Sequence, residues 1–170
     1  MDIIPEIKAR FSLRDYRKNP VPADVLERIL EAGRLAPSAK NRQAWRFVAI
    51  QDDEIKKRMQ EACYGEDYIG LAPVLIAFCT TNIDYVMPNG QASYPIDLSF
   101  PAAFMMIQAQ HEGLGSCLVS TYDEADVKQI LTVPYSMRVV HLMTLGYSAR
   151  DADPLRDRFP ASRVISYDHW

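Results

Sequence analysis

The sequence has little of what a metal site or a common nucleotide-binding loop requires. It contains three histidines and three cysteines in 170 residues, and none of them stands at a spacing typical of metal ligands. No G-x-G-x-x-G motif and no Walker A motif occurs in it. We therefore expect no metal ion, and we interpret Cys63, Cys79 and Cys117 as reduced core thiols of a cytoplasmic protein.

Long apolar runs are also missing. The longest one, Leu71–Cys79, has nine residues, whereas a membrane-spanning helix needs about 20. The first residues, Met1–Lys8, include acids and a proline where a signal peptide would have a basic and then an apolar stretch. We expect neither a membrane span nor a signal peptide. Hydrophobic residues still make up 48% of the chain, which suits one folded domain over residues 1–170 and excludes a disordered chain.

Positive charge is absent from a long central stretch. Residues 59–127 contain no lysine or arginine, whereas residues 1–58 contain 13 of the 19 in the chain, and no acid lies between Glu31 and Asp52. Because the net charge is −3, this clustering predicts a local anion site and no nucleic-acid partner. A nucleic-acid-binding domain that uses the basic residues between 8 and 46 is the rival interpretation. The acidic chain and the lack of a recognised module argue against it.

Hydrophobic periodicity predicts helices interspersed with strands. One of these helices, capped by Asp52 or Asp53, presents Ile55, Met59 and Cys63 on one face. Because helices and strands intermix, we expect an α+β fold with a single mixed or antiparallel sheet flanked by helices. The other helices are expected at 2–10, 23–35, 96–112 and 123–131, the strands at 45–51, 74–80, 114–120 and 137–147, and a loop at 82–94.

Two segments predict contact with another subunit. The helix expected at 96–112 is apolar on most sides, which is typical of an interior or interface helix, and Pro101 fits it only near the first turn or at a kink. After Ser148 the chain is polar and has little to bury until Val164. We therefore expect residues 148–170 to form an arm that lies along another surface, such as a partner subunit.

The basic segments carry side chains suited to an anion or a heterocycle. Arg10 and Arg14, with Ser12 between them, can surround a phosphate, although a solvated helix end is the simpler interpretation of this segment alone. Between a helix and a strand, Ser38 and Asn41 offer polar donors in a loop, where functional residues concentrate.

Two further segments are weaker signals. The run Gly113-Leu114-Gly115-Ser116 follows a helix, where glycines mostly end the helix, and Cys117 after it lies in an apolar strand. Near the end of the chain, Arg156 and Arg158 point to one side of an extended segment and can complete a phosphate site.

The combination of segments resembles the FMN-dependent nitroreductase family. The similarity rests on Arg-x-Ser-x-Arg at 10–14, Ala-Pro-Ser-x-x-Asn-x-Gln-x-Trp-x-Phe at 36–47 and Ala-Pro-Val at 72–74. It continues with Gly-Leu-Gly-Ser at 113–116, Leu-Gly-Tyr at 145–147 and Arg-x-Arg-x-Pro at 156–160. Phe11 and Ala44 depart from the family pattern, in which a basic residue and a proline are common at these positions.

The resemblance implies a homodimer with two FMN sites at the subunit interface and an arm that crosses to the partner. Residues 10–14 would hold the flavin phosphate and the pyrimidine side of the ring, with Arg14 as an electrostatic stabiliser. Pro37 and Ser38 would reach the flavin of the other subunit, and residues 118–120 would line the ring. The residues implied to bind the cofactor are Arg10, Phe11, Ser12, Arg14, Pro37, Ser38, Asn41, Leu118, Val119, Ser120, Arg156 and Arg158.

The resemblance also implies an oxidoreductase. Hydride would pass from NADH or NADPH through flavin N5 to a small organic acceptor, such as a nitroaromatic or a quinone, in ping-pong turnover, and no side chain is needed as a general acid or base. Two alternatives stay open. One is a non-enzymatic protein that binds or stores FMN, and the other is a flavin-dependent dehalogenase-type relative.

Overall fold

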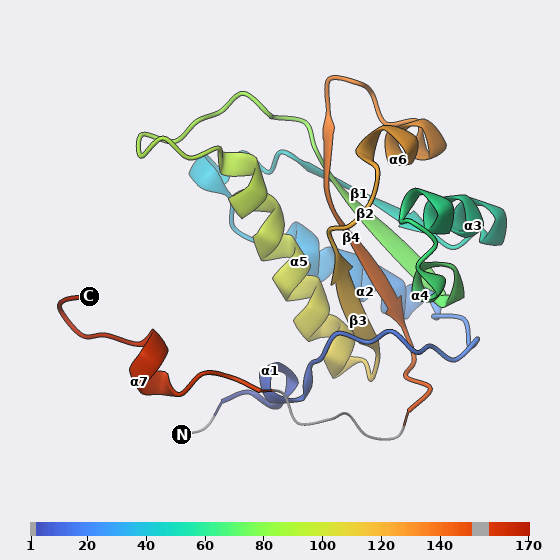
Figure 1. The fold of residues 1–170 in the computed structure, drawn as a ribbon, viewed down its shortest axis with the longest axis horizontal. Helices are drawn as coiled ribbons and strands as arrows, with labels where there is room; N and C mark the ends of the chain where they lie inside the picture. The colour runs from blue at the N-terminus through green and yellow to red at the C-terminus, as the bar shows by residue number, and fades with distance from the viewer. Residues whose placement is uncertain (1–2, 151–156) are drawn as a thin grey trace.

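The chain folds as a four-stranded sheet with helices on both faces, which confirms the α+β prediction (Figure 1). The computed structural model describes residues 3–150 and 157–170. The sheet is antiparallel throughout, in the strand order β1-β2-β4-β3. The strands are β1 (Trp45–Ile50), β2 (Val74–Thr80), β3 (Gly115–Val119) and β4 (Arg138–Gly146). The helices are α1 (Pro5–Ala9), α2 (Ala23–Arg34), η1 (Ala39–Asn41), α3 (Asp53–Ala62), α4 (Asp67–Leu71), α5 (Ser93–His111), α6 (Glu124–Leu131) and α7 (Ala161–Val164).

Strand β2 occupies the centre because it is apolar on both faces. All seven of its residues are buried, and it pairs with β1 on one side and β4 on the other. Val74, Ile76 and Phe78 point toward α2 and α5, whereas Leu75 and Ala77 point toward α3, α4 and α6. The continuous apolar run predicts this double burial, and the structure confirms the predicted bounds.

Helices α2 and α5 cover one face of the sheet and pack closely against each other. A side chain at Gly33 of α2 would collide with Met105 of α5, so the glycine permits the close approach. Leu98 and Ala102 of α5 are buried in the same cluster as Ile29 of α2. This packing fixes the position of α5 along the whole sheet.

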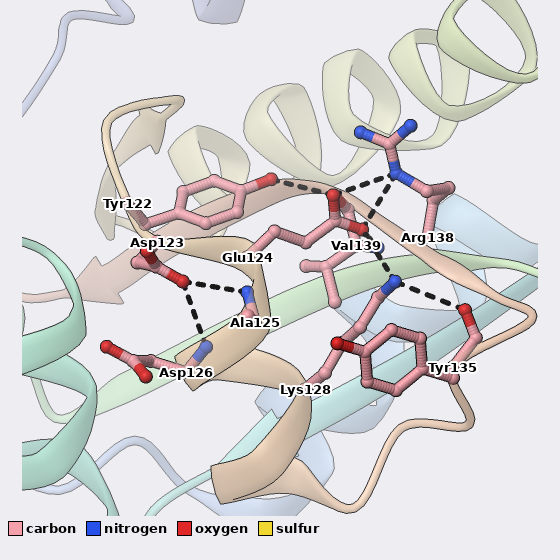
Figure 2. A network of polar contacts seen from close by, with 9 residues as sticks. All are labelled: Tyr122, Asp123, Glu124, Ala125, Asp126, Lys128, Tyr135, Arg138 and Val139. Carbon is pink, nitrogen blue, oxygen red and sulfur yellow. Dashed lines mark hydrogen bonds and ion pairs between the residues drawn. The ribbon is translucent and has the colours of Figure 1, made fainter.

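Helix α6 is tied to the start of β4 by a compact polar network, shown in Figure 2. The Glu124 carboxylate accepts hydrogen bonds from Arg138 Nε at 2.8 Å and from the Val139 N–H at 2.9 Å. Lys128 Nζ lies 3.3 Å from the same carboxylate. Asp123 caps the helix by accepting from two backbone N–H groups of its first turn. We call these residues, 122–139, the α6–β4 corner.

Several element boundaries differ from the sequence predictions. Helix α5 begins at Ser93, three residues before the predicted start, so Pro95 occupies its first turn. Pro101 does not lie in the first turn, one of the two expected places, but in the interior of α5, where it is buried. Helix α1 covers only Pro5–Ala9 of the predicted range 2–10. The sequence does not predict α4 and η1.

Within residues 3–150 and 157–170, no helix has the length and apolar composition that crossing a membrane requires.

Candidate functional site

The segment 10–17 is an extended strap fastened between the sheet edge and the end of β4. The Leu13 N–H donates to the Ser116 carbonyl of β3 at 3.0 Å, and the Arg17 N–H donates to the Tyr147 carbonyl at 2.9 Å. Leu13 is buried, and a side chain at Gly115 would collide with it. Small residues in the Gly113–Ser116 motif therefore let the strap lie directly against β3.

A buried tyrosine holds the middle of this strap. The Tyr16 hydroxyl donates to the Leu13 carbonyl at 2.7 Å and lies 2.7 Å from Thr144 Oγ1 of β4. Burial raises the pKa of the Tyr16 phenol, so it stays neutral at physiological pH. Because the strap is extended, neighbouring side chains point to opposite sides. Leu13 is buried on one side, and Ser12 and Arg14 are exposed on the other.

Arg14 lies beside an aromatic ring and a buried thiol. Its Cζ atom is 5.6 Å from the centroid of the Tyr68 ring of α4. Burial raises the pKa of the Cys117 thiol, while the Arg14 charge and a hydrogen bond with Ser12 act in the opposite direction. Cys117 is thus a neutral buried thiol, as predicted, and Arg14 is the fixed positive charge of this region.

The edge of β3 lies next to the strap. β3 is the last strand in the sheet order, and among the described residues the bridge to its outer edge joins Ser12 to Ser116. Farther along, Leu118 is 38% exposed, Val119 is buried and Ser120 is exposed. The structure therefore brings residues 10–14 and 118–120 of the prediction to the same edge of the sheet.

The predicted loop residues Pro37, Ser38 and Asn41 lie elsewhere, beside the N-terminal end of α5. The Ala39 N–H donates to the buried Asp97 carboxylate of α5 at 2.7 Å, and Ser38 Oγ accepts from the Gln43 N–H at 2.9 Å. The strap instead adjoins the C-terminal end of α5, where His111 Nδ1 lies 2.9 Å from Glu6 of α1. Helix α5 has 19 residues, so its ends are separated by about 28 Å.

The predicted site is therefore split into two parts within one chain (Figure 1). We call residues 10–14 with 118–120 the strap half-site, and the residues Pro37, Ser38 and Asn41 the loop half-site. Between them, the outer side of α5 carries a stripe of exposed apolar side chains at helical spacing, namely Ile96, Phe100 and Phe104, each about 40% exposed. A single chain does not bring the two half-sites together.

The C-terminal residues 157–170 are exposed along their whole length and project away from the sheet (Figure 1). They include large apolar side chains, of which Phe159 is 62% and Tyr167 is 85% exposed. Arg158 lies in this segment, and its Nη1 donates to the carbonyl of its neighbour Asp157 at 2.7 Å. Arg156 lies outside the described residues.

The donors of the strap half-site fit an FMN molecule. A phosphate needs cations and hydroxyl donors, which Arg10, Ser12 and Arg14 supply on one side of the strap. The edge of a flavin ring needs backbone N–H and C=O groups, which the outer edge of β3 offers. Cys63, Cys79 and Cys117 are buried free thiols, and in the described part of the chain no three His, Cys, Asp or Glu side chains gather as a metal site.

Sequence reasoning missed two aromatic residues, one near each half-site. Tyr68 contacts Arg14 across 54 positions of the chain, and Tyr85 lies under Arg42 from a loop more than 40 positions away. Neither stands in a motif, and each belongs to an element whose position depends on the sheet topology. The only available signal was the presence of tyrosines next to acid-rich or turn-rich segments, which is not specific.

Comparison with known proteins identifies the family. The sequence profile of the Nitroreductase family matches residues 7–67 and 65–147. The chain is 29% identical to a Thermus thermophilus NADH dehydrogenase, and the match covers 92% of this chain and 91% of the relative. It is 36% identical to a Bacillus subtilis FMN reductase [NAD(P)H], over 46% of this chain and 31% of the relative. A solved nitroreductase family protein from Clostridium difficile 630 superposes over 100% of both chains with a TM-score of 0.89 and 27% identity. The chain therefore belongs to the nitroreductase family.

Proposed function

We propose that this chain binds FMN and catalyses electron transfer from NADH or NADPH to a small organic acceptor, such as a nitroaromatic or a quinone. The observation that carries the proposal is the strap half-site, in which Arg10, Ser12 and Arg14 stand on a strap that pairs with the outer edge of β3. The family membership and the FMN and NAD(P)H in the name of the B. subtilis relative support it.

The chain's own residues bind and tune the cofactor in this proposal. Bound FMN supplies the hydride chemistry at N5, alternately with the dinucleotide and with the acceptor. Arg10 and Arg158 hold the phosphate in this proposal, and Arg156, outside the described residues, is assigned the same role. Arg14 places a permanent positive charge near the ring, where it stabilises the electron-rich state. The backbone of residues 118–120 contacts the ring edge, and Phe11 packs beneath the strap against Leu13 and Tyr16.

The proposed active form is a homodimer of the single domain 1–170. Packing α5 against its two-fold copy in antiparallel orientation covers the apolar stripe and brings the loop half-site of one subunit to the strap half-site of the other. Pro37, Ser38 and Asn41 then reach the partner's flavin. The arm, residues 148–170, crosses to the partner and covers its own exposed apolar side chains there.

The visible spectrum of the purified protein tests this function. We expect a yellow protein, or stoichiometric uptake of added FMN, and bleaching of the flavin absorbance when NADH or NADPH is added without oxygen. A colourless protein that ignores added FMN would contradict the proposal.

Flavin uptake without bleaching would instead favour the alternative, a protein that binds or stores FMN. If bleaching occurs, reoxidation by a nitroaromatic, a quinone and a halogenated phenol in parallel distinguishes a reductase from a dehalogenase-type relative.

A further inference from the structure

Two exposed cations next to the loop half-site, Lys40 and Arg42, lie near the ring of Tyr85. The Arg42 Cζ atom lies 3.6 Å, and the Lys40 Nζ atom 5.5 Å, from the centroid of the Tyr85 ring. None of the ion pairs in the described part of the chain includes Lys40 or Arg42. An anion that contacts both cations would be attracted by each of them.

The backbone beneath these cations is fixed in an uncommon conformation. Lys40, Asn41 and Gln43 have φ angles of +53°, +53° and +51°, a region that costs a non-glycine residue about 1 kcal/mol. Hydrogen bonds from the Ala39 N–H to Asp97 and from the Gln43 N–H to Ser38 hold the loop in this shape. Side chains 40 and 42 are thus directed to one place before any ligand arrives.

The surroundings of the ring favour negative charge. Arg42 and Lys40 lower the pKa of the Tyr85 phenol, Arg42 the more strongly. Asp97, the acid bonded to this loop, is buried and accepts from the backbone, and Asp84, the chain neighbour of Tyr85, forms no ion pair with either cation. The Arg42 guanidinium carries five N–H donors, so it can contact the ring and still donate to a ligand.

We propose that Lys40 and Arg42 bind the 2′-phosphate of NADPH and thereby make this chain prefer NADPH to NADH. This inference rests on the proposed function. A phosphate monoester carries a charge of about −1.5 to −2 and three acceptor oxygens, whereas each phosphate of a pyrophosphate bridge carries one charge. Two adjacent cations, one with a planar fork of donors and one with a mobile point charge, match the monoester better.

The position of the loop supports this choice of ligand. Lys40 and Arg42 lie two and four positions after Ser38, which with Pro37 reaches the partner's flavin in the proposed dimer. A dinucleotide whose nicotinamide stacks on that flavin extends outward across the loop. The flavin phosphate itself has its own cations, Arg10 and Arg158, so the loop cations are left for the second nucleotide.

Binding of 2′,5′-ADP and 5′-AMP to the FMN-loaded protein, measured by calorimetry, tests the inference. We expect wild type to bind 2′,5′-ADP at least tenfold more tightly than 5′-AMP. R42Q and K40Q should each weaken 2′,5′-ADP binding about tenfold and leave 5′-AMP and FMN binding unchanged. R46Q is the matched control, because Arg46 is an exposed cation of β1 that lies next to Cys79, on the other face of the sheet. It should change neither affinity.

Steady-state kinetics add a second measurement. In R42Q, kcat/KM for NADPH should fall about tenfold while kcat/KM for NADH stays within twofold of wild type. Equal losses for both dinucleotides, equal losses for both nucleotides, or an R46Q effect as large as that of R42Q would each overturn the assignment. So would a loss of FMN from R42Q and K40Q, which would assign these cations to the flavin. If neither dinucleotide reduces the wild type while 2′,5′-ADP still binds through Arg42, the proposed function fails and the phosphate site stands.

Discussion

Charged groups have different surroundings in the α6–β4 corner and at the two ends of α5. In the corner, Glu124 receives two hydrogen bonds and a lysine, so the charges of that region are satisfied within the chain (Figure 2). At the ends of α5, Arg14 and Arg42 contact aromatic rings, and an apolar stripe between them is exposed. The difference separates a region that stabilises the fold from a surface that, in the proposed dimer, is completed by ligands and by a second subunit.

The largest expected effect concerns the stripe. Phe100→Asp places a carboxylate where the proposed dimer buries an apolar ring, so we expect a monomer in light scattering and almost complete loss of bound FMN. The control is Gln129→Asp, which adds the same charge at an exposed position of α6. A Phe100→Asp protein that stays dimeric and yellow would remove the distinction between the two regions.

The next effect concerns the corner. Glu124→Gln removes the charge that Arg138 and Lys128 share, and we expect it to lower the free energy of unfolding by about 2 kcal/mol, a drop in Tm of roughly 4–8 °C, without changing FMN affinity. Glu31→Gln is the comparison, since its pair with Arg34 is exposed to solvent and should contribute much less to stability. Thermal unfolding followed by circular dichroism measures both.

A smaller effect distinguishes two arginines of the proposed flavin site. Arg14→Ala should lower the midpoint potential of the bound flavin by about 20–45 mV, which is 1 to 2 kcal/mol for two electrons, because the charge acts on the reduced ring. Arg158→Ala should weaken FMN affinity by about 1.5–3 kcal/mol, with turnover restored by excess FMN. Redox titration at saturating FMN decides between them, and a larger shift in Arg158→Ala would reverse the two roles.

The smallest effect is a pH dependence at the C-terminal end of α5. Glu6 raises the pKa of His111, and the pKa of Glu6 is lowered, chiefly by the hydrogen bond with His111. The histidine contribution is complete below about pH 6.5 and is lost as the pH rises through the folded pKa, whereas the glutamate contribution is lost in acid. We expect wild type to melt slightly higher at pH 5.5 than at pH 8, and His111→Gln to lose this difference. An unchanged difference in the variant would assign the dependence to other groups.

Local patterns predict the sheet well because burial in it follows the residue type directly. The seven buried residues of β2 and the Asp52 and Asp123 caps are visible in the sequence itself. The start of α5 is different. Turn residues such as Gly90 suggest a loop up to residue 94, but hydrogen bonds from the Ser93 N–H to Tyr85 and from Ala39 to Asp97 begin the helix earlier.

The candidate site could be predicted only in parts. The strap and the loop are recognisable as basic segments, yet their separation by the length of α5 follows from the packing of α2, α5 and β3, which no local pattern encodes. The contact of Tyr68 with Arg14 likewise depends on α4, a five-residue helix too short to give a periodic signal. The roles of the individual site residues stay predictions.

The placement of the two half-sites at opposite ends of α5 has a genetic consequence. If each flavin site takes its strap from one subunit and its loop from the other, a chain inactivated in the strap at residues 10–14 and a chain inactivated in the loop at Pro37 and Ser38 are defective in different halves of the same site. Mixed dimers of the two then contain one site with both lesions and one with none. Co-expression of two inactive chains should therefore restore about a quarter of the wild-type activity, since half of randomly assorted dimers are mixed and each has one intact site.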